Sequence, residues 1–285
     1  MIRVIQDKNA QDFLSHATPL LYAKEAEYGL MLGLCEGLAS GSIKNEFSPV
    51  FLRVVDDYGK TSAALVQTRK DNCIVTSANF DEAKAFADFV VENKLYFEGV
   101  VGPTETSKTI TESYGQKVNS KIRVGMAQNI MQFTKTDWPQ KISGNFEIAT
   151  ESDFDLIADW LMAFAREALP HDNADEAHFR KIAEAKIKKQ EAFLWIENGV
   201  KKAMTLSGRP TKNGVSVSGV YTPKSERRKG YASNLVASVS DHLIRQGKSF
   251  CVLYTDAANP TSNKIYQNIG YKIIGESSHY ILTRD

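Results

Sequence analysis

The stretch Arg227-Arg228-Lys229-Gly230-Tyr231-Ala232 follows the apolar, β-branched run 215–222 and opens a helical pattern over 232–246. A strand that leads through a basic, glycine-containing turn into a helix start is typical of a phosphate site. The free N–H groups at such a helix start point at the ligand, and the helix dipole favours negative charge there. Gly230 lets the backbone approach closely, and three cations add positive charge. The sequence therefore predicts a site for a phosphorylated cofactor.

The C-terminal half reads as strands and helices around this turn. Apolar residues recur at helical spacing after the Thr150/Asp153 capping pair, and Asn198-Gly199 marks a hairpin turn. Pro260 at a first helical position and glycines after helix ends set further boundaries. The pattern predicts strands over 146–149, 192–197, 202–208, 215–222, 250–255, 271–274 and 280–283, and helices over 154–165, 175–189, 232–246 and 260–269.

The N-terminal half repeats the second part of this order less clearly. We expect a helical stretch over 20–38, strands over 50–56, 62–69, 73–76, 99–101 and 122–133, and helices over 81–92 and 104–114. At the turn that corresponds to the basic loop, Ser77-Ala78-Asn79-Phe80-Asp81 has no glycine and no basic residue. The sequence predicts a diverged copy that does not hold phosphates in the same way.

A linker is predicted over 137–145, because this segment holds Pro139 and Gly144 and lacks an apolar period. The chain of 285 residues is long enough for two domains of ordinary size. We therefore expect a mixed α/β protein with a degenerate domain over 1–138 and a domain that carries the basic loop over 145–285.

The composition narrows the class of protein. A net charge of +1 argues against a nucleic-acid or membrane-surface partner. No apolar run approaches the length of a membrane span, and Met1 to Phe13 lacks an apolar signal core, so a cytoplasmic location is expected. Three cysteines without a Cys-x-x-Cys pair and five scattered histidines predict neither a metal site nor a disulfide framework.

Two motifs carry a family resemblance. The C-terminal half resembles the GCN5-related N-acetyltransferase (GNAT) superfamily through Arg227-x-x-Gly230-x-Ala232, which matches the family's pyrophosphate loop, and through the run Asn259 to Tyr271. That run matches the family's Asn-to-Tyr helix, which is followed by glycine and an aromatic residue. The segment Leu253-Tyr254-Thr255-Asp256 is similar to the corresponding segment of the FR47 and glycine N-acyltransferase-like subgroup. The resemblance covers roughly residues 145–285 and, with the repeated order, implies two tandem GNAT-like domains, each a mixed, mostly antiparallel sheet flanked by helices.

The resemblance implies acetyl-CoA as the cofactor, bound between splayed parallel strands at 215–222 and 250–255. Backbone groups of Val220, Tyr221 and Thr222 are implied to pair with the pantetheine amides. Arg228 stands where many members carry glycine, and its guanidinium is expected to reach a phosphate of CoA. The remaining implied cofactor-binding residues are Arg227, Lys229, Gly230, Tyr231, Ala232, Ser233, Asn259, Asn263 and Tyr266.

Tyr266 matches the family's general-acid position, and a phenol with a pKa near ~10 stays protonated at neutral pH. Asn259, Asn263 and Tyr266 share one helix face by their spacing. A packing role for Tyr266 and a capping role for the two asparagines are the alternatives. The backbone N–H of Val220 or Tyr221 is implied as the donor to the thioester oxygen. The general base stays open among Glu197, Tyr221, Asp256 and a water relay.

The acceptor is expected to be an amine of a small molecule or peptide that attacks the thioester directly. Pro170-His171-Asp172-Asn173 matches the region that lines the family's acceptor pocket, with a plain interhelical loop as the alternative. Lys186-Ile187-Lys188-Lys189 is interpreted as a solvated helix face. The N-terminal domain is expected to shape the acceptor site or to supply a homodimer surface. Two other functions are kept: a non-catalytic acyl-CoA sensor, and a tandem aminoacyl-tRNA-dependent transferase.

Overall fold

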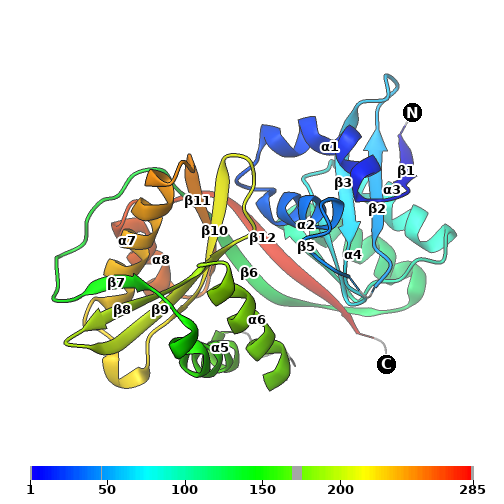
Figure 1. Cartoon of the computed structure of the whole chain (residues 1–285). Helices are drawn as coiled ribbons and strands as arrows, with labels where there is room; N and C mark the ends of the chain where they lie inside the picture. The colour runs from blue at the N-terminus through cyan, green and yellow to red at the C-terminus, as the bar shows by residue number, and fades with distance from the viewer. Residues whose placement is uncertain (1, 46, 169–174, 284–285) are drawn as a thin grey trace. The chain divides into compact units, whose positions relative to one another are not determined.

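A computed structural model describes residues 2–45, 47–168 and 175–283 (Figure 1). The chain divides into two compact units. Unit 1 comprises Met1–Met131, Tyr254–Pro260 and Ile273–Asp285, and unit 2 comprises Gln132–Leu253 and Thr261–Lys272. The predicted domains 1–138 and 145–285 were continuous, and the observed units are not, because segments near the C-terminus group with unit 1.

One order of elements occurs twice along the chain: strand, two helices, three strands, helix, strand, helix, strand. The first set is β1 (Arg3–Asp7), α1 (Ala10–Ala23), α2 (Gly29–Ala39), β2 (Val50–Val55), β3 (Thr61–Gln67), β4 (Asn72–Val75), α3 (Phe80–Glu92), β5 (Gly99–Pro103), α4 (Thr104–Val118) and β6 (Lys121–Phe133). The second set is β7 (Asn145–Ile148), α5 (Phe154–Ala168), α6 (Glu176–Lys188), β8 (Ala192–Glu197), β9 (Val200–Gly208), β10 (Gly214–Tyr221), α7 (Tyr231–Arg245), β11 (Phe250–Asp256), α8 (Pro260–Asn268) and β12 (Lys272–Thr283). The predicted duplication is confirmed.

The sequence prediction was wrong near the N-terminus. The helical stretch expected over 20–38 is two helices, and α1 begins earlier, at Ala10, where the Asn9 side chain accepts the N–H of Asp12 at 2.9 Å. Strand β1 was not predicted, because its five residues are mostly exposed or half-buried and lack an apolar alternation. It pairs antiparallel with β2.

The sheet of unit 1 has the strand order β1-β2-β3-β4-β5-β12-β6. Alternate residues of its strands face opposite layers, as expected for a pleated sheet. Phe51 and Ala64 pack with α1 and α2, whereas Leu52 and Leu65 pack with α3 and α4. The sheet therefore lies between two helical layers (Figure 1).

In unit 2 the order is β11-β10-β9-β8-β7. Neighbouring strands are antiparallel except β10 and β11, which are parallel. Leu194 and Met204 pack with α5 and α6, whereas the Phe193 ring lies 6.1 Å from that of His242 on α7. The mixed, mostly antiparallel sheet flanked by helices is as predicted. No helix of the described residues is both long and apolar enough to cross a membrane.

The last strand departs from the sequence prediction. We expected two short strands, over 271–274 and 280–283, within the second domain. Instead β12 is one strand, and its residues Ser277 to Ile281 pair antiparallel with Pro103 to Gly99 of β5 in unit 1. Local apolar periodicity cannot reveal this, because the paired residues are far apart in the sequence and either sheet offers the same kind of edge.

Candidate active site

Strand β10 leaves its parallel partner early. Only Gly214, Val215 and Ser216 pair with β11, opposite Phe250, Cys251 and Val252. On its other side β10 stays paired with β9, with an irregularity between Ser218 and Tyr221, where Gly219 has a φ of +60°. Three steps on β10 there oppose two on β9, which is a β-bulge. The backbone of 217–221 is therefore not paired with β11, as the predicted pantetheine-binding role of Val220 and Tyr221 requires.

The basic loop contains two left-handed residues. Arg228 has a φ of +64° and Gly230 of +86°, whereas Arg227 is extended, with a φ of −70° and a ψ of 159°, and Lys229 is not in the left-handed region. A left-handed residue other than glycine costs about 1 kcal/mol. This conformation explains why glycine suits the position that Arg228 occupies here.

The start of α7 is uncapped. Gly230 is the N-cap residue and offers no side-chain acceptor, and the first turn holds no acidic residue. The first helical bond runs from the Asn234 N–H to the Gly230 carbonyl at 3.0 Å. Within the described residues, the N–H groups from Arg228 to Ser233 donate to no backbone carbonyl or side chain. These donors fit a pyrophosphate, and the buried Thr222 Oγ1, which has no hydrogen-bond partner among the described residues, is a further free polar atom at the end of β10.

The three cations of the loop differ in their partners. The Arg227 guanidinium bonds to Glu167 at 2.6 Å and to the Thr222 carbonyl at 2.9 Å, and it lies 5.9 Å from the centre of the Tyr221 ring. Lys229 bonds to Glu226 at 2.9 Å. Arg228 has no ion pair with a described residue. The sequence predicted three mobile cations, and the structure leaves Arg228 to face a ligand while Arg227 fixes the loop to α5.

The predicted linker 137–145 packs against the start of α7. The Asn234 side-chain amide donates to the Gln140 carbonyl at 3.2 Å, and a Cβ on Gly230 would lie 3.4 Å from Ile142. Glu197 accepts hydrogen bonds from Ser143 and from the Tyr231 hydroxyl. These two bonds lower the pKa of Glu197, and the bond to Glu197 together with burial raises the pKa of Tyr231 to about 12. Glu197 thus holds the loop in place and is a poor candidate for the general base.

Tyr266 lies on α8 with its ring partly exposed. Its ring centre is 6.0 Å from that of Tyr271, which is buried and bonds to Ser240 of α7 at 2.8 Å. Burial raises the pKa of Tyr266 to about 12, so the phenol keeps its proton at neutral pH. No hydrogen bond joins the Tyr266 hydroxyl to a described residue. Asn263 lies on α8, three residues before Tyr266, and Asn259 directly precedes the helix.

The other predicted residues lie as follows. Tyr221 ends β10, and its ring centre is 6.0 Å from that of Trp160 on α5. The Asp256 carboxylate accepts the Ala258 N–H at 2.9 Å in the turn before α8, which suits a structural role. The segment Pro170-His171-Asp172-Asn173 lies outside the described residues. Within the basic run, Lys186 is not on a solvated face as expected, because it is partly buried and bonds to Glu191 at 2.6 Å. Sequence reasoning missed Trp160 and Glu167, whose roles depend on contacts between distant segments.

Comparison with known proteins gives one family match. Residues 194–281, which include β10, the basic loop, α7, β11 and α8, match the family model described as FR47-like protein. No curated protein sequence matches the chain.

Solved structures match over the whole chain. A GNAT-family acetyltransferase from Colwellia psychrerythraea is 12% identical with a TM-score of 0.57, and 100% of each chain is covered. A GCN5-related N-acetyltransferase from Sphaerobacter thermophilus is 15% identical with a TM-score of 0.64, covering 99% of this chain and 96% of its own. A tandem GNAT protein from the clavulanic acid biosynthesis pathway is 7% identical with a TM-score of 0.56, covering 99% and 98%.

This chain has the tandem GNAT fold. The two copies of that fold differ at the phosphate loop. In unit 1 the α3 start has a complete capping box, in which the Asn79 side chain accepts the Glu82 N–H and Glu82 accepts the Asn79 N–H. Asp81 adds a second carboxylate to that turn. The GNAT-like unit 1 therefore presents a capped helix start with negative charge, where unit 2 presents an uncapped one without acidic residues.

The residue that corresponds to Tyr266, the predicted general acid, also differs between the two GNAT-like units. Ile110 on α4 and Tyr266 on α8 each lie six residues after the first residue of their helix. Ile110 is fully buried and carries no proton donor. At these positions unit 1 thus has neither the uncapped helix start nor the phenol of unit 2, which supports its interpretation as a degenerate copy.

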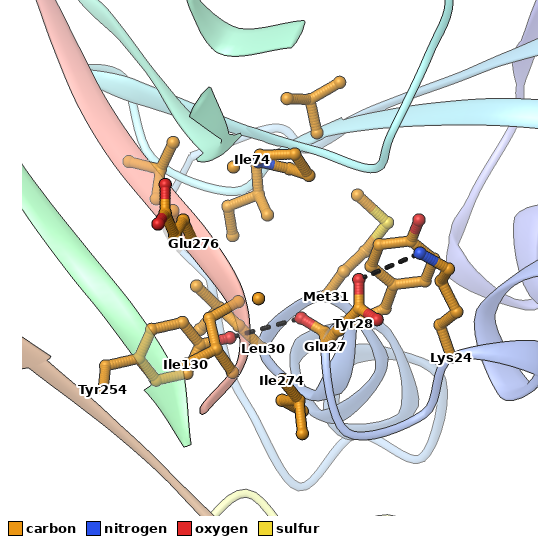
Figure 2. A pocket seen from close by; sticks show the side chains of 16 residues that line it. Lys24, Glu27, Tyr28, Leu30, Met31, Ile74, Ile130, Tyr254, Ile274 and Glu276 are labelled. Carbon is orange, nitrogen blue, oxygen red and sulfur yellow. Dashed lines mark hydrogen bonds and ion pairs between the residues drawn. The ribbon is translucent and has the colours of Figure 1, made fainter. Parts of the chain in front are cut away.

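Unit 1 nevertheless contains a cavity of about 290 Å³ at the carboxyl ends of its parallel strands β4 and β5 (Figure 2). Residues of these strands, of the α1–α2 connection and of β12 form its walls. In a GNAT fold this is the place that corresponds to the β10 and β11 strand ends in unit 2.

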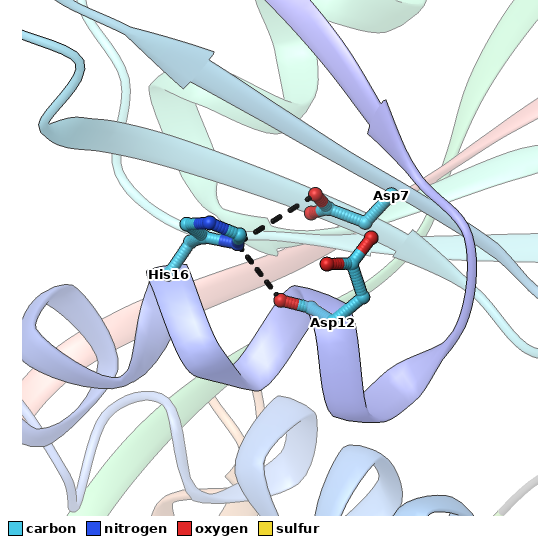
Figure 3. A group of neighbouring side chains, drawn as sticks. All are labelled: Asp7, Asp12 and His16. Atoms are coloured by element: carbon cyan, nitrogen blue, oxygen red, sulfur yellow. Dashed lines mark hydrogen bonds and ion pairs between the residues drawn. The ribbon is translucent and has the colours of Figure 1, made fainter.

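A second group of polar side chains in the GNAT-like unit 1 has a structural role (Figure 3). Asp7, Asp12 and His16 each place one metal-ligand atom within 4.8 Å of the others. Both Asp7 oxygens already accept hydrogen bonds from Arg53, at 2.6 and 2.7 Å, and both side chains are buried. Because Arg53 supplies the positive charge, we assign the group to holding α1 against β1 and β2.

Proposed function

We propose that the chain is an acetyl-CoA-dependent N-acetyltransferase with one active site, in unit 2, that acts on an amine of a small molecule or peptide. The observation that carries the proposal is the uncapped start of α7, where a basic loop follows a bulged strand that has left its parallel partner. Free backbone donors there suit the pyrophosphate of CoA, and the family match over the same elements supports this choice of ligand.

The proposed roles of the unit 2 residues are as follows. The N–H groups of Arg228 to Ser233 bind the pyrophosphate, and Arg228 adds a charge for a phosphate. Acetyl-CoA, when bound, supplies an acetyl group activated as a thioester. The Val220 or Tyr221 N–H orients the thioester oxygen, and the Tyr266 hydroxyl holds a proton that it gives to the departing sulfur. The amine forms the new C–N bond by direct attack as the C–S bond breaks, and it passes its proton to a water relay. A covalent enzyme intermediate is not invoked, since the three cysteines of the chain are buried and burial raises the pKa of each thiol.

An amine-dependent thiol-release assay tests this proposal. With acetyl-CoA present, at least one class among polyamines, amino acids, aminoglycosides and peptide N-termini is expected to release free CoA thiol well above the rate of hydrolysis. Acetyl-CoA is also expected to raise the melting temperature, because a ligand that binds the folded state stabilises it. A rise in melting temperature without thiol release from any amine would favour the acyl-CoA sensor, and no rise at saturation would contradict both.

The tandem aminoacyl-tRNA-dependent transferase is the weaker alternative. Such a function calls for a basic surface for tRNA, whereas the net charge is +1. A transferase that uses aminoacyl-tRNA also does not account for the uncapped start of α7.

A further inference from the structure

The cavity of unit 1 is lined by none of the residues of the proposed active site. Its lining comes entirely from segments of unit 1. Ile74 and Val101 approach it from β4 and β5, Met31 from α2, and Ile274 from β12, as Figure 2 shows for the labelled side chains. A cavity at the carboxyl ends of parallel strands is where open α/β sheets bind ligands.

Most of the wall is apolar. Leu30, Met31, Ile74, Ile130 and Ile274 present aliphatic or thioether groups, and Tyr28 and Tyr254 add rings. The Tyr28 hydroxyl accepts the Ser77 N–H at 3.2 Å, and the Tyr254 hydroxyl donates to the Glu27 carbonyl at 3.4 Å, so their polar ends are tied to the backbone. The walls therefore favour a ligand with an alkyl or aryl body.

Charged lining residues indicate which sign of charge the ligand carries. Lys24 and Glu27 form an ion pair at 3.2 Å and neutralise each other. Glu276 of β12 is exposed and has no ion pair with a described residue. The lining thus carries one net negative charge, which a cation at the mouth would complement.

Phosphates are disfavoured in the same unit. The N–H groups of Asn79 and Glu82 at the start of α3 are already bonded in the capping box, and Asp81 and Glu82 make that turn negative. A CoA-like ligand would meet like charge where it needs donors. The cavity of unit 1 therefore lies beside a helix start that does not suit an anion.

We propose that the unit 1 cavity binds an organic monocation, a primary amine with an alkyl or aryl body, as a second ligand site. The bound amine is not acetylated there, since unit 1 lacks both the phosphate donors and a residue equivalent to Tyr266. The site does not depend on coenzyme binding in unit 2 and is testable in its absence.

Hexylamine is a suitable probe, with 1-hexanol as its neutral match. In the full chain with isoleucine methyl groups labelled, hexylamine at pH 7 is expected to shift the NMR signals of Ile74, Ile130 and Ile274. The signals of Ile157 and Ile187 in the core of unit 2 are expected to stay in place. 1-Hexanol should bind about three- to fivefold more weakly, the upper range for a partly exposed charge pair. Equal affinities for the two probes, or shifts confined to unit 2, would overturn the proposal.

The substitution Glu276→Gln removes the carboxylate charge and keeps the volume of the side chain. It is expected to weaken hexylamine binding about three- to fivefold while leaving 1-hexanol binding unchanged. Glu92→Gln, on the exposed end of α3 outside the cavity, is the matched control and should change neither. If Glu276→Gln and Glu92→Gln bind hexylamine as the wild type does, or if hexylamine shifts no methyl signal up to its solubility limit, the site does not exist. Failure of acetyl-CoA to bind in unit 2 would leave this result unaffected.

Discussion

Replacement of Ala232 by glutamate is expected to weaken acetyl-CoA binding by about 100-fold or more. Ala232 lies in the first turn of α7, which carries no acidic residue and whose N–H groups have no acceptor among the described residues. A carboxylate there would repel the pyrophosphate and compete for the same donors, as Asp81 and Glu82 do at the start of α3. Calorimetric titration of the variant with acetyl-CoA measures the change.

Gln246→Glu is the matched control for this charge. It adds the same carboxylate at the other end of α7, at the exposed C-cap, and is expected to leave acetyl-CoA affinity within about twofold. If Ala232→Glu binds acetyl-CoA as tightly as Gln246→Glu, the start of α7 is not the phosphate site.

Tyr266→Phe is expected to lower kcat by about 100-fold or more and to leave the Kd for acetyl-CoA within about twofold. The change removes a proton donor and keeps the ring. Because burial raises the pKa of Tyr266 to about 12, the phenol is protonated below that pH, and its ionisation should not reduce kcat anywhere between pH 6 and 10. Steady-state kinetics over that pH range, beside calorimetry, separates the two effects.

Tyr271→Phe is the control for loss of a neighbouring hydroxyl. It breaks the buried bond to Ser240 and is expected to lower the free energy of unfolding by about 1 kcal/mol with little change in kcat. An unchanged kcat in Tyr266→Phe would instead support the packing role or a function without turnover.

Much of the fold is encoded locally in the sequence. Strand β8 falls on the predicted range 192–197, and the Thr150/Asp153 capping box and the left-handed Asn198-Gly199 turn are as expected, since each depends on neighbouring residues. The pairing of β12 with β5 and the division into units depend instead on contacts between distant segments. Strand β1 carries too little apolar patterning to predict.

The candidate site follows the same division. The predicted residues Val220 to Ser233 form one loop and helix start, because they are consecutive and the strand–turn–helix order fixes their relation. The ion pair between Arg227 and Glu167, the tilted ring contact between Trp160 and Tyr221 and the hydrogen bonds of Glu197 join separate elements, and no local pattern indicates them. Arg228 shows the opposite case, since the departure from glycine marked in the sequence coincides with a φ of +64°.

The number of acetyl-CoA molecules bound per chain tests the central claim most directly. Calorimetric titration of the intact chain is expected to give one molecule per chain, with that binding lost in Ala232→Glu. The uncapped start of α7 and the capped start of α3 require this result. Two equivalent sites per chain, or one site that persists in Ala232→Glu, would contradict the account.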